Sequence, residues 1–144
     1  MYFCFMVSVK ETDFFKEVVK VFNYPFGNVY VFDGFVVSEL NQGGTIGWEQ
    51  TKLIVDDVTR FFNSKGENVI YISNRINSYS VIATDWLKFF KQRYTLKAYC
   101  VVSENQSGIL NLMIEKLFFK NKIKHFEDIY TAINFVKKGL AEVA

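Results

Sequence analysis

Residue types that bind metals, form cross-links or break structure are scarce in this chain. Its 144 residues include one proline, one histidine and two cysteines. A single histidine, His125, without a cysteine pair at ligand spacing excludes a structural zinc site, and we expect His125 on the surface or at a helix cap. Cys4 and Cys100 lie far apart in apolar, strand-like segments, which favours buried free thiols over a disulfide. No metal or cofactor is predicted.

Long hydrophobic runs are also missing. A membrane-spanning helix requires about 20 consecutive apolar residues, and a charge or a turn interrupts every apolar run well before that length. The first apolar stretch, Tyr2 to Val9, has no basic segment before it and no small-residue cleavage pattern after it, so it resembles neither a signal peptide nor an anchor. We therefore expect a cytoplasmic protein without a membrane span.

The hydrophobic content is nevertheless high. Hydrophobic residues make up 50% of the chain and aromatic residues 18%, which is ample for the core of one globular domain but not for two separate cores at this length. We expect a single domain over residues 1–144, with its core at about residues 15–140. Residues 1–13 are expected to form an N-terminal extension or an edge strand, which could pair across a homodimer.

The order of apolar runs and turn signals predicts an α/β domain. Phe14 to Tyr24 and Val29 to Val37 are predicted antiparallel strands, and Asp33-Gly34 marks a second turn or a bulge. Further strands are expected at 68–73, 96–103 and 123–126, and helices at about 47–64, 84–92, 107–120 and 127–138. The alternation indicates parallel strands joined by crossover helices. The expected fold is a single mixed five-stranded sheet, with an antiparallel opening pair, then parallel strands, and about four packing helices.

Motifs that identify common enzymes do not occur. Neither glycine-rich phosphate-binding fingerprint is present, and the segment 43–47 is expected to be a flexible connection. The adjacent acids Asp56 and Asp57 point about 100° apart on a helix, so they are poorly placed to share one site. An enzyme that used Arg75 to bind an anion and Ser80 as nucleophile would need a base, and none lies near these residues in the sequence. We predict no catalytic residues.

The charge is unevenly distributed along the chain. The net charge is +2, yet residues 86–124 carry eight basic and two acidic side chains. Basic and aromatic residues alternate between Trp86 and Tyr94, a pattern found in nucleic-acid-binding surfaces. The same spacing is typical of an amphipathic helix packed on a core, so we predict no nucleic-acid partner.

One polar segment is the strongest candidate for a binding site. It follows the strand that ends at Ser73 and contains Asn74, Arg75, Asn77, Ser78, Tyr79 and Ser80. The carboxyl end of a parallel strand is where crevices tend to form. Two interpretations stay open: these side chains satisfy the backbone of their own loop, or they contact a protein partner or a small ligand.

The order of elements and the segment Val69-Ile70-Tyr71-Ile72-Ser73-Asn74-Arg75-Ile76-Asn77-Ser78-Tyr79-Ser80 resemble the SpoIIAA-like branch of the STAS domain superfamily. The opening pair with Gly27-Asn28-Val29, the strand 96–103 and the closing strand and helix at 126–135 complete the resemblance. It implies a small mixed sheet packed by helices, in a protein that binds other proteins or small ligands without catalysis. In the anti-sigma-factor antagonists of this superfamily, a regulatory serine opens the helix after the third strand. Ser80 falls nearest to that place and Ser78 is an equally defensible register, so both are candidate phosphorylation sites.

Two functions from different classes follow from these observations. The first is a non-enzymatic regulatory or protein-interaction module, whose contact surface is the loop after the third strand and the adjoining helix. The alternative is a small apolar-ligand or lipid-binding domain of SEC14-like character. In this alternative Phe118, Phe119 and Phe126, close to four lysines, would line a pocket with a basic mouth.

Overall fold

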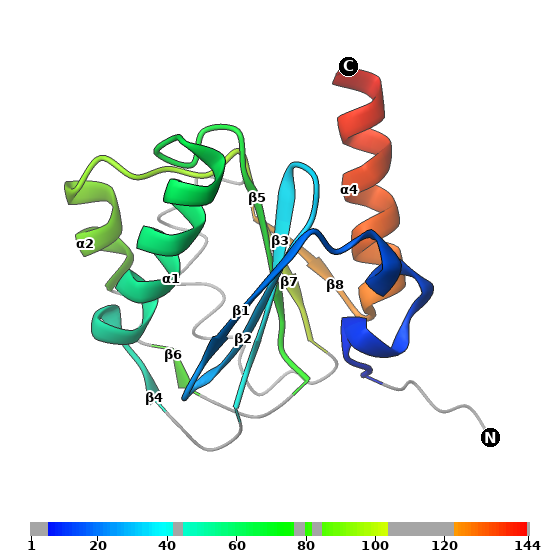
Figure 1. The fold of residues 1–144 in the computed structure, drawn as a ribbon, viewed down its shortest axis with the longest axis horizontal. Coiled ribbons are helices and arrows are strands. Elements are labelled where there is room, and N and C mark those ends of the chain that lie inside the picture. The colour runs from blue at the N-terminus through cyan, green and yellow to red at the C-terminus, as the bar shows by residue number, and fades with distance from the viewer. Residues whose placement is uncertain (1–5, 42–44, 77–79, 82–84, 104–122, 144) are drawn as a thin grey trace.

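A six-stranded sheet forms the centre of the protein (Figure 1). The computed structural model describes residues 6–41, 45–76, 80–81, 85–103 and 123–143, and describes only the backbone at 80, 81, 86 and 140–143. The strand order is β1-β2-β3-β5-β7-β8. The six strands are β1 (Lys20–Tyr24), β2 (Gly27–Val31), β3 (Phe35–Leu40), β5 (Ile70–Asn74), β7 (Ala98–Val102) and β8 (Ile123–Phe126).

The sheet is mixed, as the sequence predicts. Strands β1, β2 and β3 form an antiparallel meander. Strands β3, β5, β7 and β8 are parallel to one another, so their carboxyl ends lie at one edge of the sheet. A second sheet of two short parallel strands, β4 (Thr45–Ile46) and β6 (Ser80–Val81), follows the ends of β3 and β5. The prediction of a single sheet is therefore wrong.

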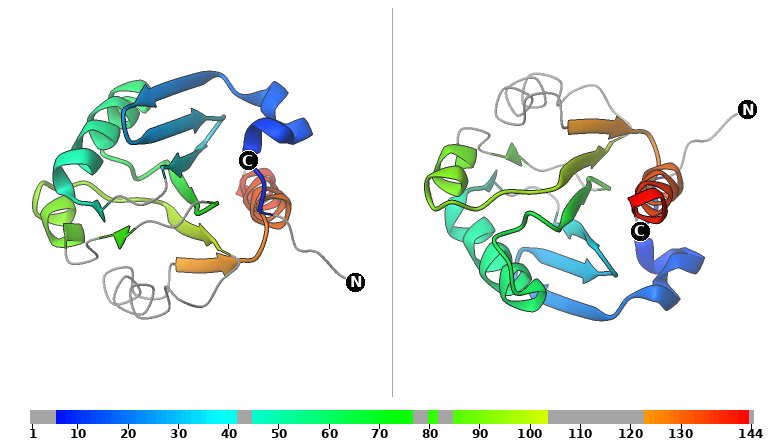
Figure 2. Two further views of the ribbon diagram at one scale, coloured as in Figure 1. Left: turned by 90° about the horizontal axis from the view of Figure 1, so that it is seen from below. Right: turned by 90° about the horizontal axis from the view of Figure 1, so that it is seen from above.

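Helices cover both faces of the main sheet (Figure 2). On one face lie α1 (Trp48–Phe62) and α2 (Trp86–Lys91). On the other lie α4 (Ile129–Val143) and two short 3-10 helices, η1 (Val9–Glu11) and η2 (Asp13–Glu17). The described part of the chain thus contains three α-helices where about four were expected, and the expected helix at 107–120 lies outside it.

Alternation of side chains along the strands divides the core into two layers. Tyr30 of β2 and Phe32, which follows it, contact the α4 layer, whereas Val29 and Val31 of β2 contact the α1 layer. The α4 layer also contains Ile72, Cys100, Ile129 and Ile133, all with 1% or less of their surface exposed. Because both faces are covered, the inner parallel strands β3, β5 and β7 are buried on both sides, which explains their largely apolar sequences.

The count of five strands is wrong because Val29 to Val37 forms two strands. Asp33-Gly34 lies in a tight turn between β2 and β3, where the Phe32 N–H donates to the Phe35 carbonyl at 2.8 Å. Gly34 has a φ of 87°, which glycine adopts without steric cost. Of the two alternatives for this dipeptide, the turn is confirmed.

The chain before β1 is not a strand. The predicted strand from Phe14 begins only at Lys20, because the Thr12 hydroxyl accepts a hydrogen bond from the Phe14 N–H at 3.2 Å and starts a 3-10 helix. Residues 6–13 form no edge strand either. Val9 is fully buried in the α4 layer, so the core begins earlier than residue 15.

The closing helix is longer than expected. The sequence predicts that this helix ends near Lys138, before Gly139, but α4 continues to Val143. Gly139 is exposed within the helix and lacks the positive φ that ends many helices. The first long helix lies close to its predicted range of 47–64: α1 ends at Phe62, and Asn63, with a φ of 52°, is its C-cap.

The thiol of Cys100 should be unreactive in the folded protein. Burial in β7 raises its pKa to about 11, although the nearby Lys124 opposes this shift. The thiolate fraction at neutral pH is then about 100-fold lower than for a thiol of ordinary pKa. In a Cys4→Ser variant, iodoacetamide should label Cys100 at least about 100-fold more slowly than in denaturant, as followed by mass spectrometry. Labelling at similar rates in both conditions would contradict this burial.

Candidate functional site

The polar segment predicted as a binding site begins at the carboxyl end of β5. This strand is the fourth of the main sheet along the chain, not the third. Asn74 ends β5, Arg75 follows it, and Asn77, Ser78 and Tyr79 lie outside the described residues. Ser80 lies in β6 and pairs with Thr45 of β4, so it does not open a helix as its expected place requires.

Asn74 and Arg75 contact opposite faces of the sheet. Consecutive strand residues point to opposite sides, and the chain keeps this alternation through Arg75, whose N–H donates to the Val102 carbonyl at 2.9 Å. Asn74 contacts Glu39 and Val7 on the α4 side. Arg75 contacts Ser73 and Tyr99 on the α1 side. Asn74 and Arg75, which the sequence groups into one contact surface, therefore belong to two separate sites.

The first site is a buried cluster that holds the N-terminal segment. Glu39 is 7% exposed and accepts hydrogen bonds from the Ser8 hydroxyl at 2.6 Å and the Val9 N–H at 2.7 Å. Asn74 is fully buried and donates to Glu39 at 2.9 Å and to the Val7 carbonyl at 3.1 Å. The sequence placed Asn74 on a contact surface, but the structure gives it the role of an internal anchor.

The second site is an apolar cavity of about 70 Å³ between the sheet and the helices α1 and α2. Side chains from β3, α1 and the segment before β7 line it, among them Val36, Leu40, Ile54, Val55 and Leu96. A buried water needs about 10–15 Å³ of such space, so this cavity has room for a small ligand or for part of a larger one.

Polar groups line the cavity where β5 and β7 border it. The Arg75 guanidinium donates from Nε to the Ser73 hydroxyl at 3.1 Å and from Nη2 to the Tyr99 hydroxyl at 2.8 Å. The Tyr71 and Ser38 hydroxyls form a hydrogen bond of 2.6 Å. Arg75, Ser73, Tyr71 and Tyr99 all line the cavity. An apolar cavity with a few polar groups at one side is typical of small-molecule sites.

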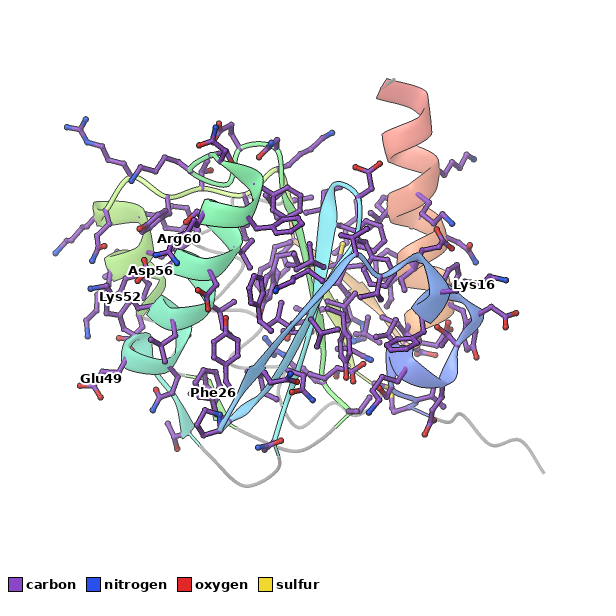
Figure 3. All side chains as sticks on the ribbon, viewed as in Figure 1. Lys16, Phe26, Glu49, Lys52, Asp56 and Arg60 are labelled. Carbon is purple, nitrogen blue, oxygen red and sulfur yellow. The ribbon has the colours of Figure 1, made fainter. Side chains whose placement is uncertain are left out.

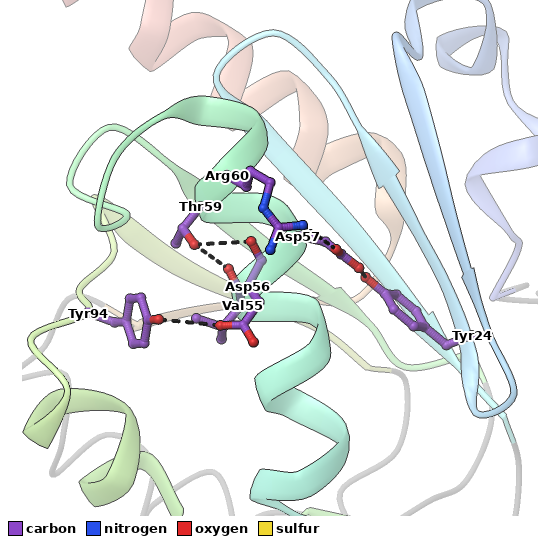
Figure 4. A network of polar contacts seen from close by, with 7 residues as sticks. All are labelled: Tyr24, Val55, Asp56, Asp57, Thr59, Arg60 and Tyr94. Carbon is purple, nitrogen blue, oxygen red and sulfur yellow. Dashed lines mark hydrogen bonds and ion pairs between the residues drawn. The ribbon is translucent and has the colours of Figure 1, made fainter.

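Hydrogen bonds on two sides of α1 fix the wall of the cavity (Figure 4). On one side the Tyr24 hydroxyl of β1 donates to Asp57 at 2.6 Å, and Arg60 pairs with Asp57 at 3.6 Å. On the other, the Tyr94 hydroxyl donates to Asp56 at 3.4 Å. These two carboxylates therefore act separately, as their adjacent positions on a helix predict.

The outer face of α1 is charged. Figure 3 shows Glu49, Lys52, Asp56 and Arg60 along this helix, spaced at three or four residues. The N-terminus of α1 also contacts the start of α2, because Asp85 accepts a hydrogen bond from the Trp48 N–H at 2.7 Å and pairs with Lys88 at 3.3 Å. Both helices are thus fixed to their surroundings by side chains that do not line the cavity.

Removal of the Tyr24 hydroxyl should destabilise the fold. Burial, together with the hydrogen bond to Asp57, raises the pKa of Tyr24 above its ordinary value of 10.0. A hydrogen bond to a charged group contributes about 1.5–3 kcal/mol, so Tyr24→Phe should lower the free energy of unfolding by about 1–2 kcal/mol for this half-buried pair. Urea unfolding at neutral pH measures this difference. Tyr130→Phe, on the exposed face of α4, should change stability by less than about 0.5 kcal/mol.

The effect of Tyr24→Phe should also depend on pH. A tyrosine with a raised folded pKa stabilises the fold fully below the unfolded pKa, and this contribution is lost as pH rises towards the folded pKa. The stability difference between wild type and Tyr24→Phe should therefore shrink above pH 10.0, the ordinary tyrosine pKa. A difference that grows with pH would contradict the direction of this shift.

The sequence missed most residues of both sites. In the sequence, Glu39 of β3 has the pattern of a solvent-exposed strand residue, and Tyr71 and Tyr99 have the pattern of core residues. Phe126, predicted to line a pocket, instead packs against Phe135 of α4 at 5.3 Å between ring centroids. The other predicted pocket residues, Phe118, Phe119 and the lysines at 116, 120 and 122, lie outside the described residues.

No protein-family model, curated protein or solved structure matches this chain. The resemblance to STAS-like domains, the protein-interaction function and phosphorylation at Ser78 or Ser80 therefore stay predictions. None of the helices in the described ranges is long and apolar enough to cross a membrane. Among the described residues that line the cavity there is no imidazole, thiol or carboxylate.

Proposed function

We propose that this protein is a non-enzymatic domain that binds a small, largely apolar molecule in the cavity between the sheet and α1 and α2. The observation that carries the proposal is the combination of an apolar cavity with polar groups on β5 and β7. Burial of apolar ligand surface in such a site is favourable by about 25 cal/mol per Å². The buried face of α1 forms one wall of the cavity. Burial of its apolar side chains stabilises this wall.

A substitution that fills the cavity tests this proposal. Val55 lines the cavity from α1, whereas Leu53 on the same helix is 49% exposed and does not line it. We expect 1-hexanol to bind to the wild type in ligand-detected NMR, and Val55→Phe to remove most of this binding. Leu53→Phe is the matched control and should bind as the wild type does.

Thermal unfolding shows whether each variant is folded before binding is compared. If a folded Val55→Phe variant binds 1-hexanol as well as the wild type does, then 1-hexanol binds elsewhere on the protein. If the wild type binds neither 1-hexanol nor another small apolar probe such as benzene, this result would contradict the proposed function.

A further inference from the structure

We propose that the exposed face of α2, with the loop residues around it, binds the surface of an anionic lipid membrane. This basic surface consists of Leu87 and five basic residues: Lys65, Lys88, Lys91, Arg93 and Lys97. None of them lines the cavity, so the inference goes beyond the proposed function and does not depend on it. The helix α2 lies at the periphery of the fold, on the opposite side of the sheet from α4 and the 3-10 helices (Figure 1, Figure 2).

The first observation is the arrangement of side chains around α2. Phe89 is 4% exposed, whereas Leu87 is 49% exposed, and Lys88 and Lys91 are exposed with it. Positions 87, 88 and 91 fall within a sector of about 100° on a helix, so this leucine lies beside two lysines on the outer face. Such a face suits a membrane interface, where leucine enters the acyl boundary while lysine ammonium groups stay among the headgroups.

The second observation is the excess of positive charge. Residues 86–97 contain four basic side chains and no acidic one. Lys65, from the loop after α1, joins them because its carbonyl accepts a hydrogen bond from the Thr95 N–H at 2.9 Å and its ammonium lies 4.7 Å from the Tyr94 ring centroid. Two segments of the chain thus place their basic residues in one region of the surface. Positive charge of this kind attracts anionic lipid headgroups.

Acidic residues beside the basic surface offset only part of its charge. Asp85 pairs with Lys88 at 3.3 Å, and Glu67 accepts a hydrogen bond from the Lys65 N–H at 3.0 Å. Within the described ranges, three basic side chains of this surface form no ion pair: Lys91, Arg93 and Lys97. The phosphate and carboxylate groups of a lipid headgroup would supply the missing negative charge.

The third observation favours a membrane over a nucleic acid. Single-stranded nucleic acids stack their bases on exposed aromatic rings. Here Phe89 is buried, and the Tyr94 ring stacks on it with 5.7 Å between centroids. Lys65 lies over the Tyr94 ring, and the Tyr94 hydroxyl donates to Asp56. The apolar side chain exposed among the lysines is aliphatic Leu87, which cannot stack with bases but gains free energy when lipid removes it from water.

Co-sedimentation of the full chain with vesicles tests the inference on the wild type. We expect tight binding to phosphatidylcholine vesicles that contain about 30% phosphatidylserine, and at least about 20-fold weaker binding to phosphatidylcholine alone. Raising the salt concentration from about 0.1 M to 1 M, which shortens the screening length from about 10 Å to 3 Å, should release most of the protein. Equal binding to both kinds of vesicle would overturn the role of charge.

Neutralisation of the three basic residues without an ion pair locates the contact. The triple variant Lys91→Gln, Arg93→Gln and Lys97→Gln should bind anionic vesicles about 100-fold more weakly, because each basic residue near a membrane contributes about fivefold. The matched control neutralises three exposed lysines on the α4 side of the sheet: Lys10→Gln, Lys16→Gln and Lys138→Gln. This control loses the same charge and should bind within about threefold of the wild type. An equal loss in both variants would show that net charge, and not this surface, binds the lipid.

A leucine pair tests whether the surface also inserts an apolar side chain. Leu87→Ser should weaken binding to anionic vesicles about five- to tenfold. Leu53 of α1 is also 49% exposed but lies outside the basic surface, so Leu53→Ser is the matched control and should bind as the wild type does. Thermal unfolding shows that each variant is folded before its binding is compared. Equal effects of the two substitutions would overturn the role of Leu87.

The remaining outcomes separate this inference from the proposed function. If the wild type binds a single-stranded DNA oligonucleotide but no phosphatidylserine vesicle, the surface binds nucleic acid and the inference is wrong. Absence of vesicle binding together with 1-hexanol binding would overturn the membrane contact and leave the cavity site intact. Vesicle binding without 1-hexanol binding would support the membrane contact and contradict the cavity site.

Discussion

Replacement of Gly66 by alanine should destabilise the protein by about 2–5 kcal/mol, because two separate costs combine. Gly66 has a φ of 107°, which side-chain-bearing residues rarely adopt. A Cβ atom there would also lie 1.9 Å from the Thr95 carbonyl oxygen, a backbone atom that cannot rotate away. The loop after α1 and the segment before β7 would have to separate, and their hydrogen bond from the Thr95 N–H to the Lys65 carbonyl would be lost.

The same substitution at Gly139 provides the control. Gly139 lies within α4, where a Cβ atom would meet no other atom within 4 Å, and alanine is the better helix former by about 1 kcal/mol. Gly139→Ala should therefore leave stability unchanged or raise it by about 0.5–1 kcal/mol. Thermal and urea unfolding of both variants check the opposite signs. A Gly66→Ala variant as stable as the wild type would mean that the loop relaxes without cost.

Replacement of Glu39 by alanine should cost about 2–5 kcal/mol of unfolding free energy, because two buried donors lose their acceptor. This substitution removes the acceptor for the Ser8 hydroxyl, the Val9 N–H and the Asn74 amide, and leaves the last two buried without that partner. Glu39→Gln should cost only about 1 kcal/mol, since an amide oxygen can accept from Val9 and Asn74 while its nitrogen donates to Ser8.

Limited trypsin digestion distinguishes this mechanism from a general loss of packing. When the N-terminal segment detaches from the sheet, Lys10 and Lys16 should be cleaved early in Glu39→Ala and late in the wild type and in Glu39→Gln. Glu67→Ala, at an exposed position of the loop after α1, should alter neither stability nor cleavage. A Glu39→Ala variant within about 1 kcal/mol of the wild type would show that this cluster does not hold the segment.

The sequence predicted the mixed sheet because the inner parallel strands β3, β5 and β7 are largely apolar and the strands alternate with amphipathic segments. It miscounted the strands at Asp33-Gly34, because apolar residues on both sides of a short turn read as one continuous run. It misread Phe14 and Phe15 as a strand, because the Thr12 side chain that begins the 3-10 helix has no apolar signature. Local sequence patterns therefore predicted most of the helices and strands, but not where each of them begins and ends.

The candidate sites were less predictable. The position of Arg75 at the end of a parallel strand was evident, and alternation alone separates it from Asn74. The partners of both residues come from distant parts of the chain: Glu39 is 35 positions from Asn74, and Tyr99 is 24 from Arg75. A buried acid and two core tyrosines acquire their roles only when β3, β5 and β7 are paired, which no local pattern reveals.

The anchor at Asn74 also imposes an order on the growing chain during translation. Val7 accepts a hydrogen bond from Asn74, 67 residues later, so the first segment has no complete docking site until β5 has been synthesised. At about 5–20 residues per second, it waits for roughly 3–13 s after its own synthesis. During that interval the packing partners of Val9 and Phe14 in the α4 layer are incomplete, so this segment would be a target for chaperones that bind nascent apolar segments.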